Sequence, residues 1–398
     1  MTIKAEGKDG HVVLMMKGVL DTSAALKTQS DIDKKLKQFP EIESLTCDVG
    51  GLTYISSSGL RILLALAKRF KDFRVTEAQP DVYRVLEMTG FTKMMSIERA
   101  LRKMSVKGCE LIGRGGVGEA YRIDEDTIIK VFREGSTMEE VRTEITMAKE
   151  AFVMGMPTAI SYDVVRVDKQ LGLVYELLHA RTLCDCLKDA PQRIDEFARM
   201  YAGLFRQMHD IRVPKDSSIP SAKERVMKSV RHIGRYFDQE SVDLLLELVE
   251  CIPDGDRLLH CDLQAKNAMI QDGEPMLIDM GEMGYGHPVI DFGNSYSAMI
   301  SLLGDYEAII GLPKELGVEL WHRMIGYYFE GLPADVVAHR LEQIEVVSKI
   351  RNFSWLALSD SVPKKLIRMC QEAFDERVLK QKDHILRVCQ TLGDWTLE

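Results

Sequence analysis

Residues 260–267 have the sequence HCDLQAKN and decide the fold of the larger part of this chain. They contain the carboxylate Asp262 and the amide Asn267, and a second carboxylate, Asp279, follows in the segment IDMG at 278–281. Phosphoryl transfer uses this set of groups, because one Asp accepts the proton of the attacking hydroxyl while an Asn and a second Asp hold metal ions on the nucleotide phosphates. Taken alone, these polar residues could equally belong to a solvated loop. The segments upstream therefore have to decide between the two interpretations.

A glycine-rich turn with the pattern G-x-G-x-x-G lies upstream. Its glycines are Gly113, Gly115 and Gly118. Such a turn lets the backbone approach phosphates closely, and dinucleotide-binding folds use a similar one. A dinucleotide-binding fold would continue directly into a helix. Here a strand, a turn at 124–126 and a second strand at 127–132 are expected instead, and the second strand carries Lys130. This order is typical of a kinase.

Lys130 would contact the α- and β-phosphates, and it needs an acidic partner to hold it there. Apolar residues at helical spacing predict the buried face of the next helix; they are Val141, Ile145, Ala148 and Phe152. Glu144 lies at the edge of this face, where a carboxylate is costly unless it is paired. We therefore predict a pair between Lys130 and Glu144. The alternative is an exposed carboxylate without a partner.

An apolar run at 171–178 (LGLVYELL) predicts a strand that leads into a hinge. Backbone groups of Glu176 and Leu178 would then face the adenine ring. An apolar strand has the same sequence pattern with or without a nucleotide, so this assignment depends on the motifs around it.

These motifs occur in the order that a kinase requires, and residues 106–398 resemble the aminoglycoside phosphotransferase and choline kinase branch of the protein-kinase-like fold. The resemblance implies an α+β domain with a small lobe at 106–178 and a large lobe at 179–398. It also implies that ATP and Mg²⁺ are the cofactors.

The resemblance assigns a role to each matching residue. Asp262 would be the catalytic base, and Asn267 and Asp279 would hold the metal. His260 and Asp291 would brace the catalytic loop through hydrogen bonds. The residues expected to bind or position the nucleotide are Gly113, Gly115, Gly118, Lys130, Glu144, Glu176 and Leu178.

Two features favour the small-molecule branch over the protein kinases. Protein kinases place a Lys two residues after the catalytic Asp, whereas this chain has Gln264. Only eleven residues separate Asp279 from Asp291, which is too few for the segment that binds a peptide. The glycine turn, however, is closer to that of protein kinases and keeps a protein substrate as an alternative. Lys266 could face either phosphate or water.

The first hundred residues have a different pattern. Strands are expected at 12–16, 18–23, 45–49, 73–77 and 94–97, and helices at 24–39, from the serines at 56–58 onward, and at 80–89. This is an α/β order. With its serine turn, the segment 1–100 resembles the STAS domain of anti-sigma factor antagonists. The resemblance implies an anti-sigma-like protein partner and a phosphorylation switch at Ser57. Ser57 or Ser58 would equally serve as a helix N-cap.

Length and composition set further limits. A chain of 398 residues is long enough for two domains, and we expect the boundary between residues 99 and 106. A net charge of −9 argues against nucleic acid or an anionic membrane as the main partner. The eight cysteines show no metal-ligand spacing, and Cys184 and Cys186 are most simply two positions of one helix. We find no signal peptide and no apolar run long enough to span a bilayer, and expect a reducing cytoplasm.

The sequence thus predicts an ATP- and Mg²⁺-dependent phosphotransferase that acts on a hydroxyl of a small-molecule acceptor, with a STAS domain that regulates or recruits it. One alternative is a signalling switch in which the kinase-like domain phosphorylates Ser57. Another is an inactive binding module, although every catalytic position is filled. Four aromatic residues could line the acceptor pocket or belong to the core: Trp321, Tyr327, Tyr328 and Trp355.

Overall fold

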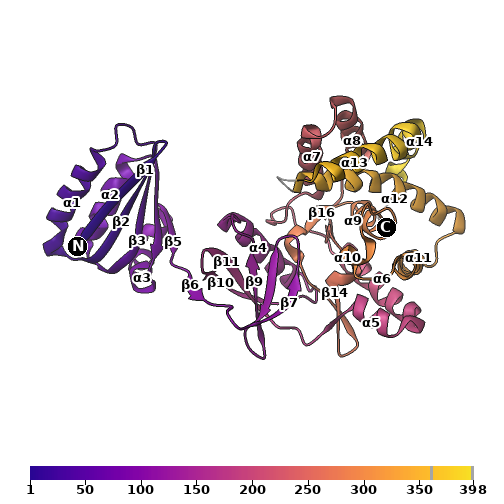
Figure 1. Cartoon of the computed structure of the whole chain (residues 1–398), viewed down its shortest axis with the longest axis horizontal. Helices are drawn as coiled ribbons and strands as arrows, with labels where there is room; N and C mark the ends of the chain where they lie inside the picture. Colours follow the sequence, from indigo (N-terminus) through magenta and orange to yellow (C-terminus); the bar gives the residue numbers. More distant parts are fainter. Residues whose placement is uncertain (359–361, 396–398) are drawn as a thin grey trace. The chain divides into compact units, whose positions relative to one another are not determined.

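The computed structural model describes residues 1–358 and 362–395, and the chain forms two compact units (Figure 1). One unit is Met1–Ser105 together with the short segment Val164–Asp168. The other is Val106–Asp163 together with the chain from Lys169 onward. Each unit has a hydrophobic core of its own. The end of the domain expected at 106–398 lies outside the described residues.

The N-terminal unit is an α/β domain built on one five-stranded sheet. The strands, in their order across the sheet, are β1 (Thr2–Lys8), β2 (His11–Leu20), β3 (Ser44–Ile55), β4 (Asp72–Ala78) and β5 (Ser96–Arg99). The β1–β2 pair is antiparallel and the other three pairs are parallel. The helices are α1 (Thr22–Leu36), α2 (Ser57–Arg69) and α3 (Pro80–Met88), and α1 and α2 lie along the sheet (Figure 1). The predicted α/β class is confirmed.

Two details of this unit differ from the prediction. The first strand, β1, has no residue that is fully buried and therefore lacks the strong apolar pattern of a core strand. The predicted strands at 12–16 and 18–23 are one strand, β2, whose register shifts around Gly18. Gly18 has a φ of +114°, a conformation that glycine adopts without steric cost, so the strand continues through a bulge.

The second unit begins with the small lobe of a kinase-like fold. Its strands are β7 (Glu110–Arg114), β8 (Gly118–Arg122), β9 (Thr127–Phe132) and β11 (Gln170–Glu176), in the order β11-β9-β8-β7. The strand β10 (Ser161–Val167) pairs with β11, and its residues from Val164 onward are grouped with the first unit; β6 (Arg102–Met104) precedes these strands in the chain. One helix, α4 (Met138–Val153), follows β9 and begins with a capping box formed by Thr137 and Glu140.

The buried face of α4 is rotated relative to the predicted one. Its buried residues are Val141, Glu144, Met147, Ala148 and Ala151. Phe152, expected in this face, is 52% exposed. Apolar spacing at i, i+4, i+7 and i+11 fits two neighbouring helix faces, and only packing selects one of them. Glu144 therefore lies in the middle of the buried face rather than at its edge.

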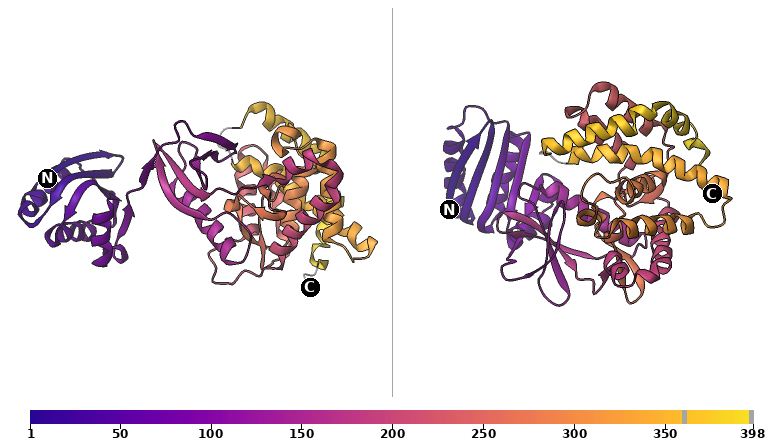
Figure 2. Two further views of the ribbon diagram at one scale, coloured as in Figure 1. Left: turned by 90° about the horizontal axis from the view of Figure 1, so that it is seen from below. Right: turned by 45° about the vertical axis from the view of Figure 1, so that its right-hand side comes forward.

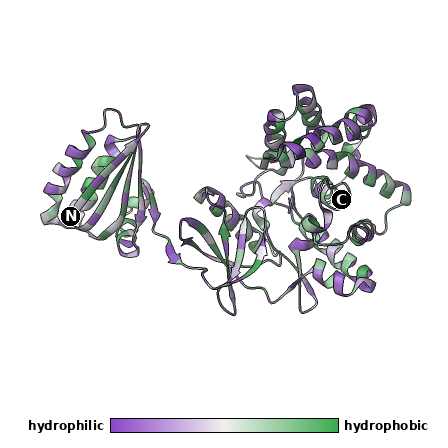
Figure 3. Cartoon of the chain, viewed as in Figure 1, coloured by the Kyte–Doolittle hydropathy of each residue, from purple (hydrophilic) through white to green (hydrophobic). Residues whose placement is uncertain are grey.

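The large lobe is mostly helical. Its helices are α5 (Leu183–Asp189), α6 (Ile194–Asp210), α7 (Ala222–His232), α8 (Gln239–Cys251), α9 (Val289–Met299), α10 (Tyr306–Ile310), α11 (Lys314–Tyr328), α12 (Ala334–Ser354), α13 (Lys364–Arg377) and α14 (Lys382–Cys389). Its short strands are β12 (Arg181–Thr182), β13 (Arg257–Leu259), β14 (Ala268–Gln271), β15 (Glu274–Leu277) and β16 (Gly284–Gly286). Figure 2 shows these helices gathered into one bundle, and in Figure 3 several of them carry hydrophobic and hydrophilic residues on opposite sides.

The helix α12 is central to this lobe. It packs along α9, and between residues 343 and 354 every residue is buried except Glu345 and Arg351. Such a helix has no single apolar face, because neighbours surround it.

The cysteines show one contact that the sequence did not predict. A disulfide joins Cys251 at the end of α8 to Cys389 at the end of α14, across 138 residues of sequence. Cys184 and Cys186 both lie in α5, as expected. In the described part of the chain, no helix is both long and apolar enough to cross a membrane.

Candidate active site

Three segments far apart in the sequence meet at Lys130. Its Nζ atom, on β9, lies 2.8 Å from Oε1 of Glu144 on α4 and 3.0 Å from Oδ1 of Asp279. The hydroxyl of Tyr175, on β11, donates to the same Glu144 oxygen at 2.6 Å. The structure thus brings together the predicted Lys–Glu pair and the second carboxylate of the catalytic region. Tyr175 was missed, because nothing in an apolar strand marks which side chain reaches a carboxylate.

The charges at this junction stabilise one another. Burial alone would lower the pKa of Lys130, but the adjacent Glu144 and Asp279 outweigh it and raise that pKa. Burial opposes ionisation of Asp279, yet Lys130 lowers its pKa overall. Burial and the Glu144 charge raise the pKa of Tyr175 well above its usual value. At neutral pH the site therefore holds a charged Lys130 between two carboxylates, with a neutral Tyr175.

The glycine turn connects β7 to β8, and its glycines have different surroundings. A Cβ atom at Gly118 would lie 2.1 Å from the carbonyl oxygen of Val131, so only glycine fits between β8 and β9. A Cβ at Gly113 or Gly115 would meet nothing closer than 3.8 Å. The Gly115 N–H donates to the Gly118 carbonyl at 2.9 Å and closes the turn. Gly118 thus serves strand packing, while Gly113 and Gly115 leave backbone open to a ligand.

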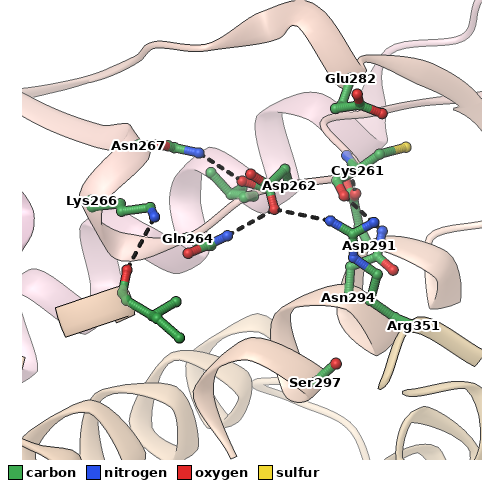
Figure 4. Close-up of polar contacts among 12 residues, drawn as sticks. Cys261, Asp262, Gln264, Lys266, Asn267, Glu282, Asp291, Asn294, Ser297 and Arg351 are labelled. Carbon is green, nitrogen blue, oxygen red and sulfur yellow. Dashed lines mark hydrogen bonds and ion pairs between the residues drawn. The ribbon is translucent and has the colours of Figure 1, made fainter. Parts of the chain in front are cut away.

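The loop at residues 260–267 places Asp262 and Asn267 beside each other. Asp262 Oδ1 accepts a hydrogen bond of 2.8 Å from the Gln264 side chain (Figure 4). The Asn267 Nδ2 donates to the Asp262 backbone carbonyl at 2.9 Å, and the Asn267 carbonyl accepts the Ile278 N–H at 3.0 Å. These bonds orient the buried Asn267 and join its segment to the one that carries Asp279.

Asp291, on α9, holds this loop in shape. Its Oδ2 accepts the His260 N–H at 2.9 Å and its Oδ1 accepts the Cys261 N–H at 2.6 Å. Cys261 has a φ of +63°, a left-handed conformation that costs energy for a non-glycine residue. His209 Nε2 lies 3.2 Å from Asp291 Oδ2, and His260 Nε2 lies 3.2 Å from the Ile278 carbonyl. His260 and Asp291 are thus placed to support the loop rather than to contact a substrate.

The predicted hinge follows β11. The Glu176 N–H donates to the Ile160 carbonyl at 2.9 Å, and the Leu177 N–H donates to the Asp126 carbonyl at 2.8 Å. Leu178 comes next and is half-buried. In Glu176 the carbonyl, not the N–H, is therefore the backbone group that could face a base.

Mg²⁺ usually binds through one or two protein oxygen ligands together with phosphate oxygens and water. Asp279 has an ionised, 46% exposed carboxylate. The Nδ2 atom of Asn267 donates to the Asp262 carbonyl, so the amide oxygen is the atom of this side chain that could bind a cation. Across residues 1–358 and 362–395 no group of three or more His, Cys, Asp or Glu residues could hold a metal by itself. The residues present therefore fit a metal that is bound jointly with a nucleotide.

One further charged residue lies close to Asp262. Arg351, on α12, has its Nη2 atom 3.5 Å from Asp262 Oδ1 (Figure 4). The sequence did not point to it, because it lies far downstream in a segment without a motif. The Nζ atom of Lys266 donates to the Ile309 carbonyl at 3.0 Å, and the charge of Lys266 also helps to lower the pKa of Asp279.

The four aromatic residues considered for the acceptor pocket have different surroundings. Trp321 is fully buried, and the Tyr328 hydroxyl lies 3.0 Å from the His209 ring, so both belong to the core. Tyr327 donates to Asp195. Trp355 is half-buried next to the end of α12 and donates to the Asn352 carbonyl.

The predicted phosphorylation site lies at the start of α2 in the N-terminal unit. Ser56 is the N-cap, and its hydroxyl oxygen accepts the Gly59 N–H at 3.4 Å. The expectation that Ser57 or Ser58 caps the helix is therefore wrong. Ser57 is the first residue of the helix, and it is exposed.

Comparisons with known proteins agree with this architecture. Residues 2–104 match the STAS domain model, and residues 109–327 match the model of the phosphotransferase enzyme family. The chain is 26% identical over 101 residues to the putative anti-sigma factor antagonist BtrV of Bordetella bronchiseptica. This match covers 24% of this chain and 85% of that protein.

One of the similar solved structures is the ADP-bound aminoglycoside phosphotransferase APH(2'')-Ib, which is 16% identical to this chain. The match covers 78% of this chain and 98% of that chain and has a TM-score of 0.44. A choline/ethanolamine kinase family protein from Mesorhizobium loti has 14% identity, with 71% of this chain and 92% of that chain covered, and a TM-score of 0.46. Because the second family model spans more than half of the sequence, the chain belongs to the phosphotransferase enzyme family, and it carries a STAS domain at its N-terminal end.

Proposed function

We propose that this phosphotransferase uses ATP and Mg²⁺ to phosphorylate a hydroxyl group of a small molecule. The observation that carries the proposal is the position of Lys130 between Glu144 and Asp279. Phosphoryl transfer in a kinase fold needs both the pair between the strand lysine and the helix glutamate and a metal-binding Asp beside it. The Lys130–Glu144 pair and the neighbouring Asp279 carboxylate support this proposal.

Asp262 acts as the base. It accepts the proton of the acceptor hydroxyl while the hydroxyl oxygen attacks the γ-phosphorus, and ADP leaves with the electrons of the broken bond. The hydrogen bond from Gln264 fixes one oxygen of the Asp262 carboxylate and leaves the other to face the acceptor. Asp291 keeps the backbone at residues 260 and 261 in the shape that presents this carboxylate.

The nucleotide is held from both lobes. Lys130 contacts the α- and β-phosphates, the glycine turn covers them, and the Glu176 carbonyl with the Leu178 backbone faces the adenine. Asn267 and Asp279 hold Mg²⁺, which neutralises phosphate charge. The carboxylate of Asp279 is already ionised beside Lys130, so it can bind a cation without first losing a proton.

The short connection between Asp279 and Asp291 supports a small acceptor. It contains only a single 3-10 turn at Met280–Glu282 and the strand β16 before α9 begins. A peptide acceptor usually requires an extended segment at this point of the chain, whereas a small molecule does not.

The test uses the full-length protein with γ-labelled ATP, Mg²⁺ and a panel of aminoglycosides, amino alcohols and sugars, with mass spectrometry of protein and small molecules. Asp262→Ala should lower turnover by about 10²- to 10⁴-fold while nucleotide binding persists. Asp279→Ala should abolish Mg²⁺-dependent nucleotide binding. Asp216→Ala, a change of an exposed loop carboxylate, is the matched control and should leave both unchanged. Full turnover in Asp262→Ala would remove that residue from the role of base.

For the STAS domain we propose that an anti-sigma-like protein binds it and thereby regulates or recruits the phosphotransferase, with Ser57 as the modified residue. The exposed Ser57 hydroxyl at the start of α2 supports this proposal. A phosphate there would add a charge of about −1.5 to −2 at the positive end of a helix, so the domain should stay folded.

The same labelling experiment examines Ser57, with Ser57→Ala against Ser58→Ala as the control. Label on Ser57 and on no small molecule would make the chain a signalling switch. Absence of both label and nucleotide binding would identify an inactive binding module.

A further inference from the structure

Transfer of a phosphoryl group builds negative charge on its oxygens, and enzymes stabilise that charge with Arg, Lys or a metal ion. The residue two positions after Asp262 is the neutral Gln264. Its side chain donates to Asp262 rather than pointing away from it. A side-chain cation that assists Mg²⁺ at the transferred group would therefore have to come from another part of the chain.

Most cations around the catalytic loop are committed to other partners. Lys130 lies between Glu144 and Asp279 and belongs to the α- and β-phosphates. Lys266 donates to the Ile309 carbonyl. Arg225, on α7, donates to the carbonyls of Glu282 and Met283.

Arg351 differs from them. It stands in the part of α12 that is otherwise almost wholly buried, so its charge needs a reason to be there. Its guanidinium lies 3.5 Å from Asp262 Oδ1, beyond the usual length of a hydrogen bond, and each of the two side chains is 26% exposed. The guanidinium is thus close to the base without being locked onto it.

We propose that Arg351 contacts the phosphoryl group during transfer and stabilises the charge that develops on its oxygens. This inference rests on the proposed function of the site. Asp262 takes the proton, the acceptor oxygen forms the new bond to phosphorus, and ADP takes the electrons of the old one. Arg351 stays protonated throughout, and its planar fork of N–H donors matches the phosphoryl oxygens.

The distances permit this contact. The acceptor oxygen would lie about 2.6–3.2 Å from the Asp262 carboxylate, and the phosphorus about 3–3.5 Å farther on. These two distances together place the phosphorus no more than about 7 Å from the Asp262 carboxylate. The Nη2 atom of Arg351 lies 3.5 Å from Oδ1, and rotation about the bonds of this long side chain can cover the remaining gap.

An alternative is that Arg351 only positions Asp262. The two roles differ in what they require: a positioning residue acts through the Asp262 carboxylate, whereas a residue that contacts the phosphoryl group acts without it. They can therefore be separated in an Asp262→Asn background.

The experiment measures binding of MgADP to the full-length protein by calorimetry, with and without aluminium fluoride, which mimics a phosphoryl group in transfer and needs no identified acceptor. Wild-type protein should bind MgADP more tightly when aluminium fluoride is present. Arg351→Ala should reduce this gain by about 10²-fold, less than the 10³–10⁵ of a fully desolvated arginine finger. Its affinity for MgADP alone should stay within about twofold, since the proposed contact of Arg351 is with the phosphoryl group and not with ADP.

Three further variants make the result decisive. Arg351→Lys should keep part of the gain, and it replaces Arg351→Ala if that variant does not fold. Arg368→Ala, on the exposed face of α13, is the matched control and should keep all of it. Arg351→Ala should reduce the gain in the Asp262→Asn background as well.

The proposal is overturned if Arg351→Ala retains the full gain, if its effect disappears in Asp262→Asn, or if the wild type binds MgADP but shows no gain. If the wild type binds no MgADP at all, the proposed function fails first. The two failures are therefore distinguishable.

Discussion

Replacing Asp291 by Asn keeps the size of the side chain but removes its charge and one of its two acceptor oxygens. In the native protein these oxygens accept the backbone N–H groups of His260 and Cys261, and all these groups are buried. An Asn can accept only one of the two N–H bonds. Its NH₂ group must then face the other backbone N–H, so one buried donor loses its partner.

The size of the effect follows from these contacts. A buried donor without a partner costs about 1–3 kcal/mol, and loss of charge on the remaining acceptor weakens that bond by about 1 kcal/mol. We therefore expect Asp291→Asn to lower the free energy of unfolding by about 2–4 kcal/mol on this estimate. The left-handed Cys261 would lose part of its support, so Asp262 should be displaced and turnover should fall more than nucleotide binding.

Urea denaturation gives the free energy of unfolding, and labelled ATP gives turnover. Asp238→Asn is the matched control, because Asp238 also accepts a backbone N–H, that of Ser241 at 2.8 Å, but as an exposed N-cap. Asn caps helices as well as Asp does, so the control should change stability by less than about 0.5 kcal/mol. A free energy of unfolding for Asp291→Asn within about 1 kcal/mol of wild type, half of the lower bound of the estimate, would refute the reasoning.

Three more outcomes are expected. Gly118→Ala should cost about 1–3 kcal/mol in urea denaturation by overpacking β8 against β9, whereas Gly116→Ala, with nothing within 4 Å, should be tolerated; equal losses would contradict the steric argument. Burial lowers the pKa of His287 from 6.5 to about 4. As the pH falls, the unfolded chain therefore binds a proton at this ring before the folded protein does, so the free energy of unfolding should decrease between pH 6.5 and 4. The full loss is about 3 kcal/mol for this shift, and about 2 kcal/mol of it lies between pH 7 and 4.5. This part should be missing from His287→Gln when denaturation is measured at these two pH values. Alkylation of the denatured protein should label six cysteine thiols without reductant and eight after reduction, because Cys251 and Cys389 form a disulfide. Eight labelled thiols in the absence of reductant would exclude this disulfide.

The geometry of His287 explains the sign of its pH effect. Its Nδ1 accepts the Val289 N–H at 3.2 Å, which requires a neutral ring, and its Nε2 lies 3.3 Å from the Trp395 carbonyl. Protonation at Nδ1 would break the first of these bonds inside the protein. The unfolded chain has no such constraint.

Much of the site was predictable because its chemistry lies in short segments. Residues 260–267 contain the proposed base and one proposed metal ligand within a single loop, and the glycine turn with the following strand specifies the position of Lys130. The choice of Glu144 succeeded for a related reason, since a carboxylate near a buried helix face needs a partner. Its place on that face was misjudged, because apolar spacing allowed two neighbouring faces and packing chose one.

In the N-terminal unit, too, the sequence predicted the class of the fold but not all of its details. Alternating apolar residues and turn signals predicted its α/β class, but the bulge at Gly18 made one strand out of two predicted ones. Ser56, and not Ser57 or Ser58, is the N-cap of α2. The prediction was wrong because any of three consecutive serines can cap a helix, and the sequence pattern does not distinguish them.

The sequence by itself determined the order of the motifs, the class of both units and the residue types that carry the chemistry, since these depend on contacts and spacing within a few residues. Tertiary structure alone decided that Tyr175 meets Glu144, that Arg351 meets Asp262, and that Cys251 meets Cys389. These contacts join segments separated by 31 to 138 residues. Local periodicity carries no information about which distant side chains meet, because that depends on how whole helices and strands pack around the core.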